Sequence, residues 1–191
     1  MRDFDIRKLL RDTTLKKFIV DSDSKIVDEL NIPITKSRID IAVLNGHLHG
    51  YEIKSSRDNL IRLPHQIEGY SKVFDYLTVV TENKHHEKIL KMLPEWVGLQ
   101  VCVETSVGFR IETIRKPYIN KNKEGFFLAK LLWREEIENI LKSQEISFRK
   151  KDTVWKLSEL LGCKIPTRKL SKIVRETLKK RVDWKLKEYY A

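Results

Sequence analysis

An acidic and a basic residue stand two positions apart in the stretch GYEIKSS, residues 50–56, where an apolar strand would be expected to end. Because side chains alternate along a strand with period two, Glu52 and Lys54 would point to the same face. Asp40 lies upstream, in the β-branched stretch RIDIAVL at 38–44. Two carboxylates and an ammonium group that converge could hold a hard divalent cation beside a phosphate group. Phosphodiester hydrolysis is the chemistry that such a set would serve.

The acid-x-lysine triplet alone is not informative, because it also occurs at 23–25, 82–84 and 183–185 of this charged chain. What distinguishes the triplet at 52–54 is its context. It ends an apolar stretch that follows Asn45-Gly46, a strong hairpin signal, and the first strand of that hairpin contains an aspartate.

The register of the hairpin decides which side chains meet. A three-residue loop pairs Ala42 with Gly50 and Asp40 with Glu52, and it gathers the apolar side chains on one face. A strict two-residue loop would scatter them over both faces, which strands with a buried face avoid. We therefore expect Asp40, Glu52 and Lys54 to share the other face. Ala42 and Gly50 are small, and we expect them to leave room there for a metal and a phosphate.

A surface salt bridge is the alternative interpretation of these three residues. Exposed ion pairs are common and contribute little to stability. Two close carboxylates also repel one another, however, and one of them would take up a proton unless a cation neutralised the pair. The residues themselves leave both interpretations open.

The stretch RIDIAVLNGHLHGYEIKSSRDNLIRL, residues 38–63, resembles the active-site signature of the PD-(D/E)xK nuclease superfamily. It is most similar to a group of small, largely uncharacterised bacterial and phage members, and the resemblance covers roughly residues 5–105. It implies a restriction-endonuclease-like fold and a DNA-cleaving hydrolase. In such a nuclease, Asp40, Glu52 and the backbone carbonyl of Ile53 would bind Mg²⁺, for which Mn²⁺ could substitute. Lys54 would orient or deprotonate the attacking water.

The resemblance also implies further site residues. An upstream acidic residue is common in the family, and Glu29 is its match, with Asp28 as the near alternative. Gln66 and Tyr70 follow at helical i,i+4 spacing, as do similar pairs near the metal in RecB-like nucleases. For this pair a solvated helix face is the alternative. Ile39 stands where the family usually has proline.

The remaining pattern predicts an α/β protein with a mixed β-sheet flanked by helices, in the order αβββαβ around the hairpin. The predicted helices cover 5–19, 64–74 and 85–93, and the predicted strands 25–32, 38–44, 47–54, 75–81, 99–105 and 109–116. The loop 118–125 looks like a hinge. We therefore predict a nuclease-like core at 1–117 and a small, basic, helical C-terminal subdomain at 118–191, with helices over 127–141, over 153–162 and after Pro166.

The formal net charge of +11 favours a polyanionic partner, DNA in the first place and RNA as the alternative. Arg168, Lys172, Arg175 and Lys179 fall at helical spacing and would form a basic stripe opposite an apolar side that includes Val182. Such stripes bind phosphates in some proteins and are merely solvated in others. Arg62 is a further candidate phosphate contact. The aromatic side chains near this end could stack on bases or pack within the subdomain: Trp155, Trp184, Tyr189 and Tyr190.

Several classes of protein are disfavoured. No stretch of eighteen apolar residues would span a membrane, and the N-terminus does not resemble a signal peptide. Cys102 and Cys163 stand far apart, which is typical of a reduced, cytoplasmic protein with inert thiols. The expected function is therefore a cytoplasmic Mg²⁺-dependent deoxyribonuclease. The alternatives are a non-catalytic nucleic-acid-binding adaptor with the same fold and, less favoured, a protein-binding module. Nucleases of this fold often dimerise, but no interface is evident in the sequence.

Overall fold

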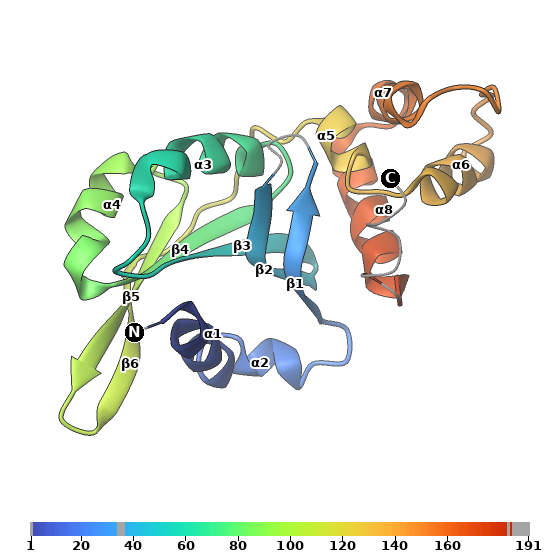
Figure 1. Cartoon of the computed structure of the whole chain (residues 1–191). Helices are drawn as coiled ribbons and strands as arrows, with labels where there is room; N and C mark the ends of the chain where they lie inside the picture. The colour runs from blue at the N-terminus through green and yellow to red at the C-terminus, as the bar shows by residue number, and fades with distance from the viewer. Residues whose placement is uncertain (1, 34–36, 183, 185–191) are drawn as a thin grey trace. The chain divides into compact units, whose positions relative to one another are not determined.

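The computed structural model describes residues 2–33, 37–182 and 184, and the chain divides into two compact units, Met1–Glu124 and Gly125–Ala191 (Figure 1). The division falls after Glu124, a few residues beyond the boundary at 117/118 that the sequence suggested. None of the helices in the described part of the chain is long and apolar enough to cross a membrane. Cys102 is buried and Cys163 is exposed, and both are free thiols.

The first unit is built on a six-stranded mixed sheet with the strand order β1-β2-β3-β4-β5-β6. The neighbours are antiparallel from β1 to β3, parallel from β3 to β5, and antiparallel again at β6. The predicted mixed α/β architecture is thereby confirmed. The strands are β1 (Lys25–Ile32), β2 (Ser37–Asn45), β3 (His47–Lys54), β4 (Tyr76–Glu82), β5 (Gly98–Thr105) and β6 (Gly108–Arg115).

Helices cover both faces of this sheet: α1 and α2 lie on one side, and α3 and α4 on the other (Figure 1). Short 3₁₀ turns precede α3 and α4. The helices and turns are α1 (Asp3–Asp12), α2 (Lys16–Ile19), η1 (Leu60–Arg62), α3 (Leu63–Ser71), η2 (Asn83–His85) and α4 (His86–Met92).

The predicted single helix over 5–19 is wrong, because the chain leaves the helical path at Thr13, where φ is −118° and ψ is −88°. The Thr13 hydroxyl donates a hydrogen bond to the Leu9 carbonyl, the kind of local side-chain bond that competes with helix continuation. The break lets Leu15 turn inward, where it is fully buried beside Ile6 and Leu10.

The predicted register of the β2–β3 hairpin is confirmed. Leu44 pairs with Leu48 and Ala42 with Gly50, and the turn is centred on Gly46, which adopts a φ of +56°. The expected apolar face is also present. Its members pack in one cluster with α1: Ile41, Val43, Tyr51 and Ile53.

The expected open space at Ala42 and Gly50 is absent, because the chain fills it. A Cβ atom on Gly50 would lie 3.2 Å from both Leu77 Cδ1 and the Phe74 ring. Ala42 is fully buried. Gly50 therefore allows the segment after α3 to pack closely on the sheet, and it gives no clearance for a metal.

The loop 118–125 was predicted as a hinge, but its residues 118–124 are attached to the first unit. The Asn120 side chain is buried and donates to the Phe74 carbonyl over 2.9 Å, while its backbone N–H donates to the Asp75 carbonyl over 2.8 Å. Further on, the Glu124 N–H donates to the Lys72 carbonyl over 3.0 Å. These hydrogen bonds fix the segment along the turn between α3 and β4.

The second unit is helical, with α5 (Gly125–Ala129), α6 (Arg134–Ser143), α7 (Val154–Lys164) and α8 (Thr167–Lys180). The helix predicted over 127–141 is in fact two, because a new helix starts after Trp133, whose N–H donates to Glu136 Oε2 over 2.7 Å. The helices α5 and α7 pack in very close contact at Gly125 and Gly162. A Cβ atom on Gly162 would lie 2.5 Å from the Phe126 nitrogen.

We expect Gly162→Ala to destabilise the second unit by about 3 kcal/mol, because backbone atoms would have to move to admit the methyl group. Urea unfolding monitored by circular dichroism measures the change. Glu159→Ala, at an exposed position of the same helix, is the matched control and should shift stability by less than about 0.5 kcal/mol. Equal stability of the two variants would contradict the close approach of α5 and α7.

Candidate active site

Glu52 and Lys54 form a buried ion pair at the carboxyl end of β3. Lys54 Nζ lies 2.6 Å from Glu52 Oε1, and the two side chains are only 11% and 3% exposed. The period of two along the strand places both on the face that α3 covers, as the sequence predicted. A pair this well enclosed differs from the solvated surface salt bridge that was the alternative.

The helix α3 closes the network with Gln66 and Tyr70, one turn apart. Lys54 Nζ donates to Gln66 Oε1 over 3.0 Å, and the Tyr70 hydroxyl lies 3.0 Å from Glu52 Oε2. Gln66 Nε2 in turn lies 3.4 Å from the Tyr70 hydroxyl. The structure thus brings together these four predicted residues, and each one fixes the orientation of the next.

Asp40 joins this site at the point where β2 and β3 separate. The last pair of their ladder is Ile41 with Tyr51. Beyond it, the Ile53 N–H donates to Asp40 Oδ2 over 2.6 Å, so a side chain takes the place of a backbone acceptor. The Arg38 carbonyl of β2 lies 3.1 Å from the Tyr70 hydroxyl in this gap and is an alternative acceptor for its single proton.

Arg7 of α1, which sequence reasoning missed, approaches Asp40 from the other side. Its Nη1 donates to the Asp40 carbonyl over 2.7 Å, and its Nη2 lies 3.3 Å from Asp40 Oδ1. The same guanidinium lies within 4 Å of three further carboxylates: Asp3, Asp28 and Glu29. The sequence contains only a weak signal for this contact, because Arg7 follows the buried Ile6 in a helix rich in charges of both signs.

Glu29, the predicted upstream acid, faces Arg7 rather than the Glu52–Lys54 pair. Its Oε1 accepts from Arg7 Nη2 over 2.8 Å, and its Oε2 lies 3.8 Å from Arg38 Nε. Glu29 adopts a φ of +53° inside β1, a left-handed conformation that costs on the order of 1 kcal/mol for a residue other than glycine. The near alternative, Asp28, pairs with Arg11 at 2.6 Å. The structure therefore does not bring either acid into the buried network.

Burial disfavours the ionised form of both carboxyl groups at the site. Burial raises the pKa of Asp40 to about 7, and the nearby Glu52 carboxylate adds to the shift, while the hydrogen bond from Ile53 and the Arg7 charge oppose it. Burial likewise raises the pKa of Glu52, against the opposing effect of Lys54. Because Arg7 is shared among several carboxylates, a further cation between Asp40 and Glu52 would be stabilised.

The chemistry of Asp40 and Glu52, two carboxylates at one site, is of the kind that a hard divalent cation requires. Mg²⁺ commonly takes one or two carboxylates and completes its shell with water and phosphate oxygens. Within the described residues no group of three or more His, Cys, Asp or Glu side chains is placed to hold a metal, so a third protein carboxylate is not available as arranged. The backbone carbonyl of Ile53 was the further predicted ligand. What the structure shows of this residue is the hydrogen bond that its N–H donates to Asp40.

The basic residues predicted to contact nucleic acid differ in their exposure to solvent. Arg62 is exposed at the end of η1. On α8, Arg168 and Lys172 are exposed, whereas Arg175 and Lys179 are half-buried. Arg175 Nη1 donates to Ser171 Oγ, and Lys179 Nζ lies 3.6 Å from Glu176. The predicted four-residue stripe is therefore reduced to two exposed cations.

Two other expectations about the basic end are also modified. Val182, expected on the apolar side of α8, is 85% exposed and lies beyond the last helical residue. The Arg181 guanidinium lies over both the Trp133 and the Trp184 ring, which gives Trp184 a packing role. Tyr189 and Tyr190 lie outside the described residues.

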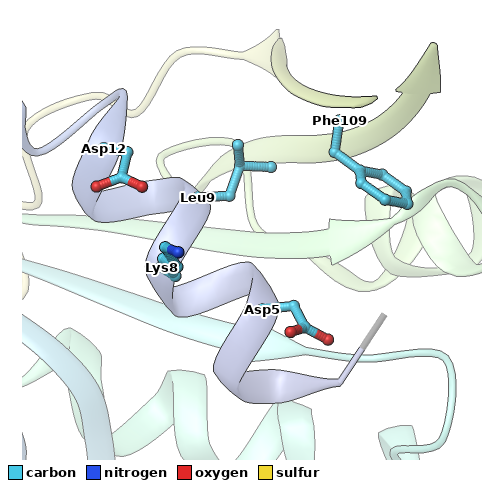
Figure 2. Close-up of a pocket in the computed structure, with 5 residues that line it drawn as sticks. All are labelled: Asp5, Lys8, Leu9, Asp12 and Phe109. Atoms are coloured by element: carbon cyan, nitrogen blue, oxygen red, sulfur yellow. The ribbon is translucent and has the colours of Figure 1, made fainter. Parts of the chain in front are cut away.

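A separate hollow of about 500 Å³ lies on the opposite side of the sheet from α3. Figure 2 shows its lining, with Phe109 contributed by β6 and the other residues by α1: Asp5, Lys8, Leu9 and Asp12. None of these belongs to the buried network, so the hollow and the candidate active site are distinct.

Comparison with known proteins identifies a family and a relative that match nearly the full length of the chain. A family model described as Bacteriophage P4 protein cII matches residues 4–190. Protein cII of Enterobacteria phage P4 is 26% identical over 184 residues, which cover 95% of this chain and 68% of that protein. Among solved structures, a protein of unknown function from Silicibacter pomeroyi superposes with a TM-score of 0.42 at 17% identity, over 72% of this chain and 89% of its own.

We expect Asp40→Asn to flatten the dependence of stability on pH. Because folding raises the pKa of Asp40 to about 7, the folded chain binds this proton more tightly than the unfolded chain. The contribution of this carboxyl group to the free energy of unfolding is therefore largest at low pH, and it is lost as the pH rises from about 4 to 7. Asparagine keeps an acceptor for the Ile53 N–H but does not titrate.

Urea unfolding of both proteins at pH 5 and pH 8 measures this effect. The free energy of unfolding of the variant minus that of the unmodified chain should be larger at pH 8 than at pH 5, which means that the variant is relatively more stable at the higher pH. The opposite sign would show that Asp40 is ionised and stabilising in the folded chain.

Proposed function

We propose that this chain, which belongs to the bacteriophage P4 protein cII family, is a metal-dependent nuclease that hydrolyses phosphodiester bonds of DNA. One observation carries the proposal: the buried Glu52–Lys54 pair, closed by Gln66 and Tyr70, lies where β2 and β3 separate beside Asp40. Two carboxylates next to a fixed lysine form a set that suits phosphoryl chemistry. The net charge of +11 supports a polyanionic substrate.

The order of elements supports a restriction-endonuclease-like core. From α1 through the β1–β2–β3 meander to α3 and β4, the first unit follows the αβββαβ sequence that the resemblance to PD-(D/E)xK nucleases implies. The candidate residues lie on the two strands of the hairpin and on the helix that follows, which is consistent with the proposed core.

Each residue of the site has a distinct task in this proposal. Asp40 and Glu52 would hold Mg²⁺ or Mn²⁺, and the bound metal supplies charge neutralisation and an activated water at neutral pH. Lys54 uses two of its three N–H donors on Glu52 and Gln66, which leaves the third to stabilise charge that develops on the phosphate. Tyr70 and Gln66 keep Glu52 and Lys54 in place.

A non-catalytic nucleic-acid-binding adaptor is the second candidate. Arg7 favours it, because its guanidinium already lies against Asp40 and Glu29, where it partly neutralises the carboxylates. In an adaptor the network would serve only to hold α3 on the sheet. DNA binding without metal-dependent cleavage would identify this function.

Cleavage assays with site variants test the nuclease directly. Supercoiled, linear and single-stranded DNA are incubated with the protein and Mg²⁺ or Mn²⁺, and products are separated on gels. Lys54→Ala and Asp40→Asn should each reduce the rate by about 100-fold or more, since each removes a charge or a ligand at the reacting phosphate. Lys84→Ala is the matched control, because Lys84 ends an identical acid-x-lysine triplet but is exposed, and its activity should be unchanged.

Cleavage by both site variants at the rate of the unmodified chain would overturn the assignment of these residues. Metal-independent binding without cleavage of any of the three DNA forms would favour the adaptor.

We also expect Arg7→Ala to tighten metal binding by about three- to ten-fold, because it removes a positive charge that contacts Asp40 Oδ1. Titration calorimetry with MnCl₂ measures the affinity. Arg11→Ala is the matched control: Arg11 lies on the same helix as Arg7 but pairs with Asp28 of β1, and its removal should leave the affinity nearly unchanged. Weaker Mn²⁺ binding in Arg7→Ala would show instead that Arg7 positions Asp40 for the metal.

A further inference from the structure

The segment RKKDTVWK, residues 149–156, forms an exposed basic and aromatic surface on the second unit. Trp155 is 59% exposed, so most of its surface is open to solvent. Four cations within the same eight residues are also exposed: Arg149, Lys150, Lys151 and Lys156. A large aromatic surface in solvent among charges of one sign marks a candidate binding site.

Hydrogen bonds between side chains and the backbone hold this segment in a defined shape. The Arg134 guanidinium donates to the carbonyls of Lys150 and Asp152, each over 2.7 Å. The Arg149 N–H donates to Asp152 Oδ2 over 2.9 Å and closes the turn. Thr153 then caps α7 by accepting from the Lys156 N–H. A surface that is already ordered loses little conformational entropy when a ligand binds.

The Trp155 ring is supported from within the unit. Its centroid lies 4.7 Å from that of Phe126 on α5, and Lys130 Nζ lies 5.7 Å from the Trp155 centroid. These contacts fix the ring and place a further positive charge at it, while the rest of its surface remains in solvent. Trp155 also lies in the first turn of α7, an eleven-residue helix whose partial positive charge lies at that end.

We propose that Trp155 and the surrounding cations of residues 149–156 bind single-stranded nucleic acid. A base would stack on the Trp155 ring, and the adjoining phosphates would contact Lys150, Lys151 and Lys156. The charge of the unit supports this partner, since residues 125–191 contain seventeen Lys and Arg against nine Asp and Glu. A single strand is required because a duplex keeps its bases stacked on one another.

The acidic residues restrict the path of the strand. Glu159 is exposed one turn after Trp155, on the same side of α7, and would repel a phosphate there. The strand should therefore run from Trp155 over the turn at 149–151 and not along α7. This inference rests on the proposed nuclease and names single strands as the substrate class of that enzyme.

Fluorescence anisotropy tests the stacking contact without involving the metal site. The full chain is titrated into a labelled short oligothymidylate, or a duplex of the same length, in EDTA. The single strand should bind more tightly than the duplex. Trp155→Ala should weaken single-strand binding by about ten-fold or more, and Trp155→Phe should retain most of the affinity. Tyr118→Ala, which removes an aromatic ring 65% exposed on the first unit, is the matched control and should bind as the unmodified chain does.

The salt dependence tests the phosphate contacts. Lys150→Ala and Lys151→Ala should each reduce the slope of log affinity against log salt by about 0.7. Lys164→Ala removes the same charge from the other end of α7 and should leave the slope unchanged.

Unchanged single-strand affinity in Trp155→Ala, or duplex binding at least as tight as single-strand binding, would overturn the proposal. Since the assay contains no divalent metal, failure of the nuclease in the cleavage assay and failure of this site are separate results. Circular dichroism of Trp155→Ala and Trp155→Phe distinguishes a lost contact from a lost fold.

Discussion

The buried ion pair between Glu52 and Lys54 is the interaction on which the arrangement of the first unit depends. Two charges removed from water are costly unless hydrogen bonds complete their surroundings. Here Tyr70 and Gln66 supply those bonds, and they can do so only if α3 lies directly over the end of β3. The same position of α3 brings Phe74 onto Gly50 and starts β4 beside β3. The polar network and the apolar packing thus require one and the same placement of α3.

On the other side of the sheet, α1 is fixed to the same site by its own charge. Ile6 and Leu10 bury the apolar face of α1 against the hairpin, and Arg7 reaches from that helix to Asp40. Asp40 therefore receives hydrogen bonds both from Ile53 on β3 and from Arg7 on α1. Hydrogen bonds from both helical layers therefore converge where β2 and β3 separate.

Sequence reasoning succeeded where a local period determined the structure. The period of two along β2 and β3, with the turn at Gly46, was sufficient to pair Ala42 with Gly50 and to place Glu52 and Lys54 on one face, although the ladder ends before the expected pair of Asp40 and Glu52. The i,i+4 spacing likewise placed Gln66 beside Tyr70. It failed where contacts distant in sequence decided the outcome. The Arg7 contact depends on how α1 crosses the sheet, and the cover over Gly50 depends on Phe74. The breaks at Thr13 and before Trp133 depend on local hydrogen bonds that hydrophobic periodicity does not reveal.

A crystal structure of the protein soaked in MnCl₂, with anomalous diffraction recorded for manganese, tests the central claim most directly. We expect an anomalous peak between Asp40 and Glu52, with an oxygen of each carboxylate within about 2.2 Å of the ion. An empty position between these carboxylates, with Arg7 still against Asp40 at saturating Mn²⁺, would contradict the account and leave the network as a structural element of a nucleic-acid-binding protein.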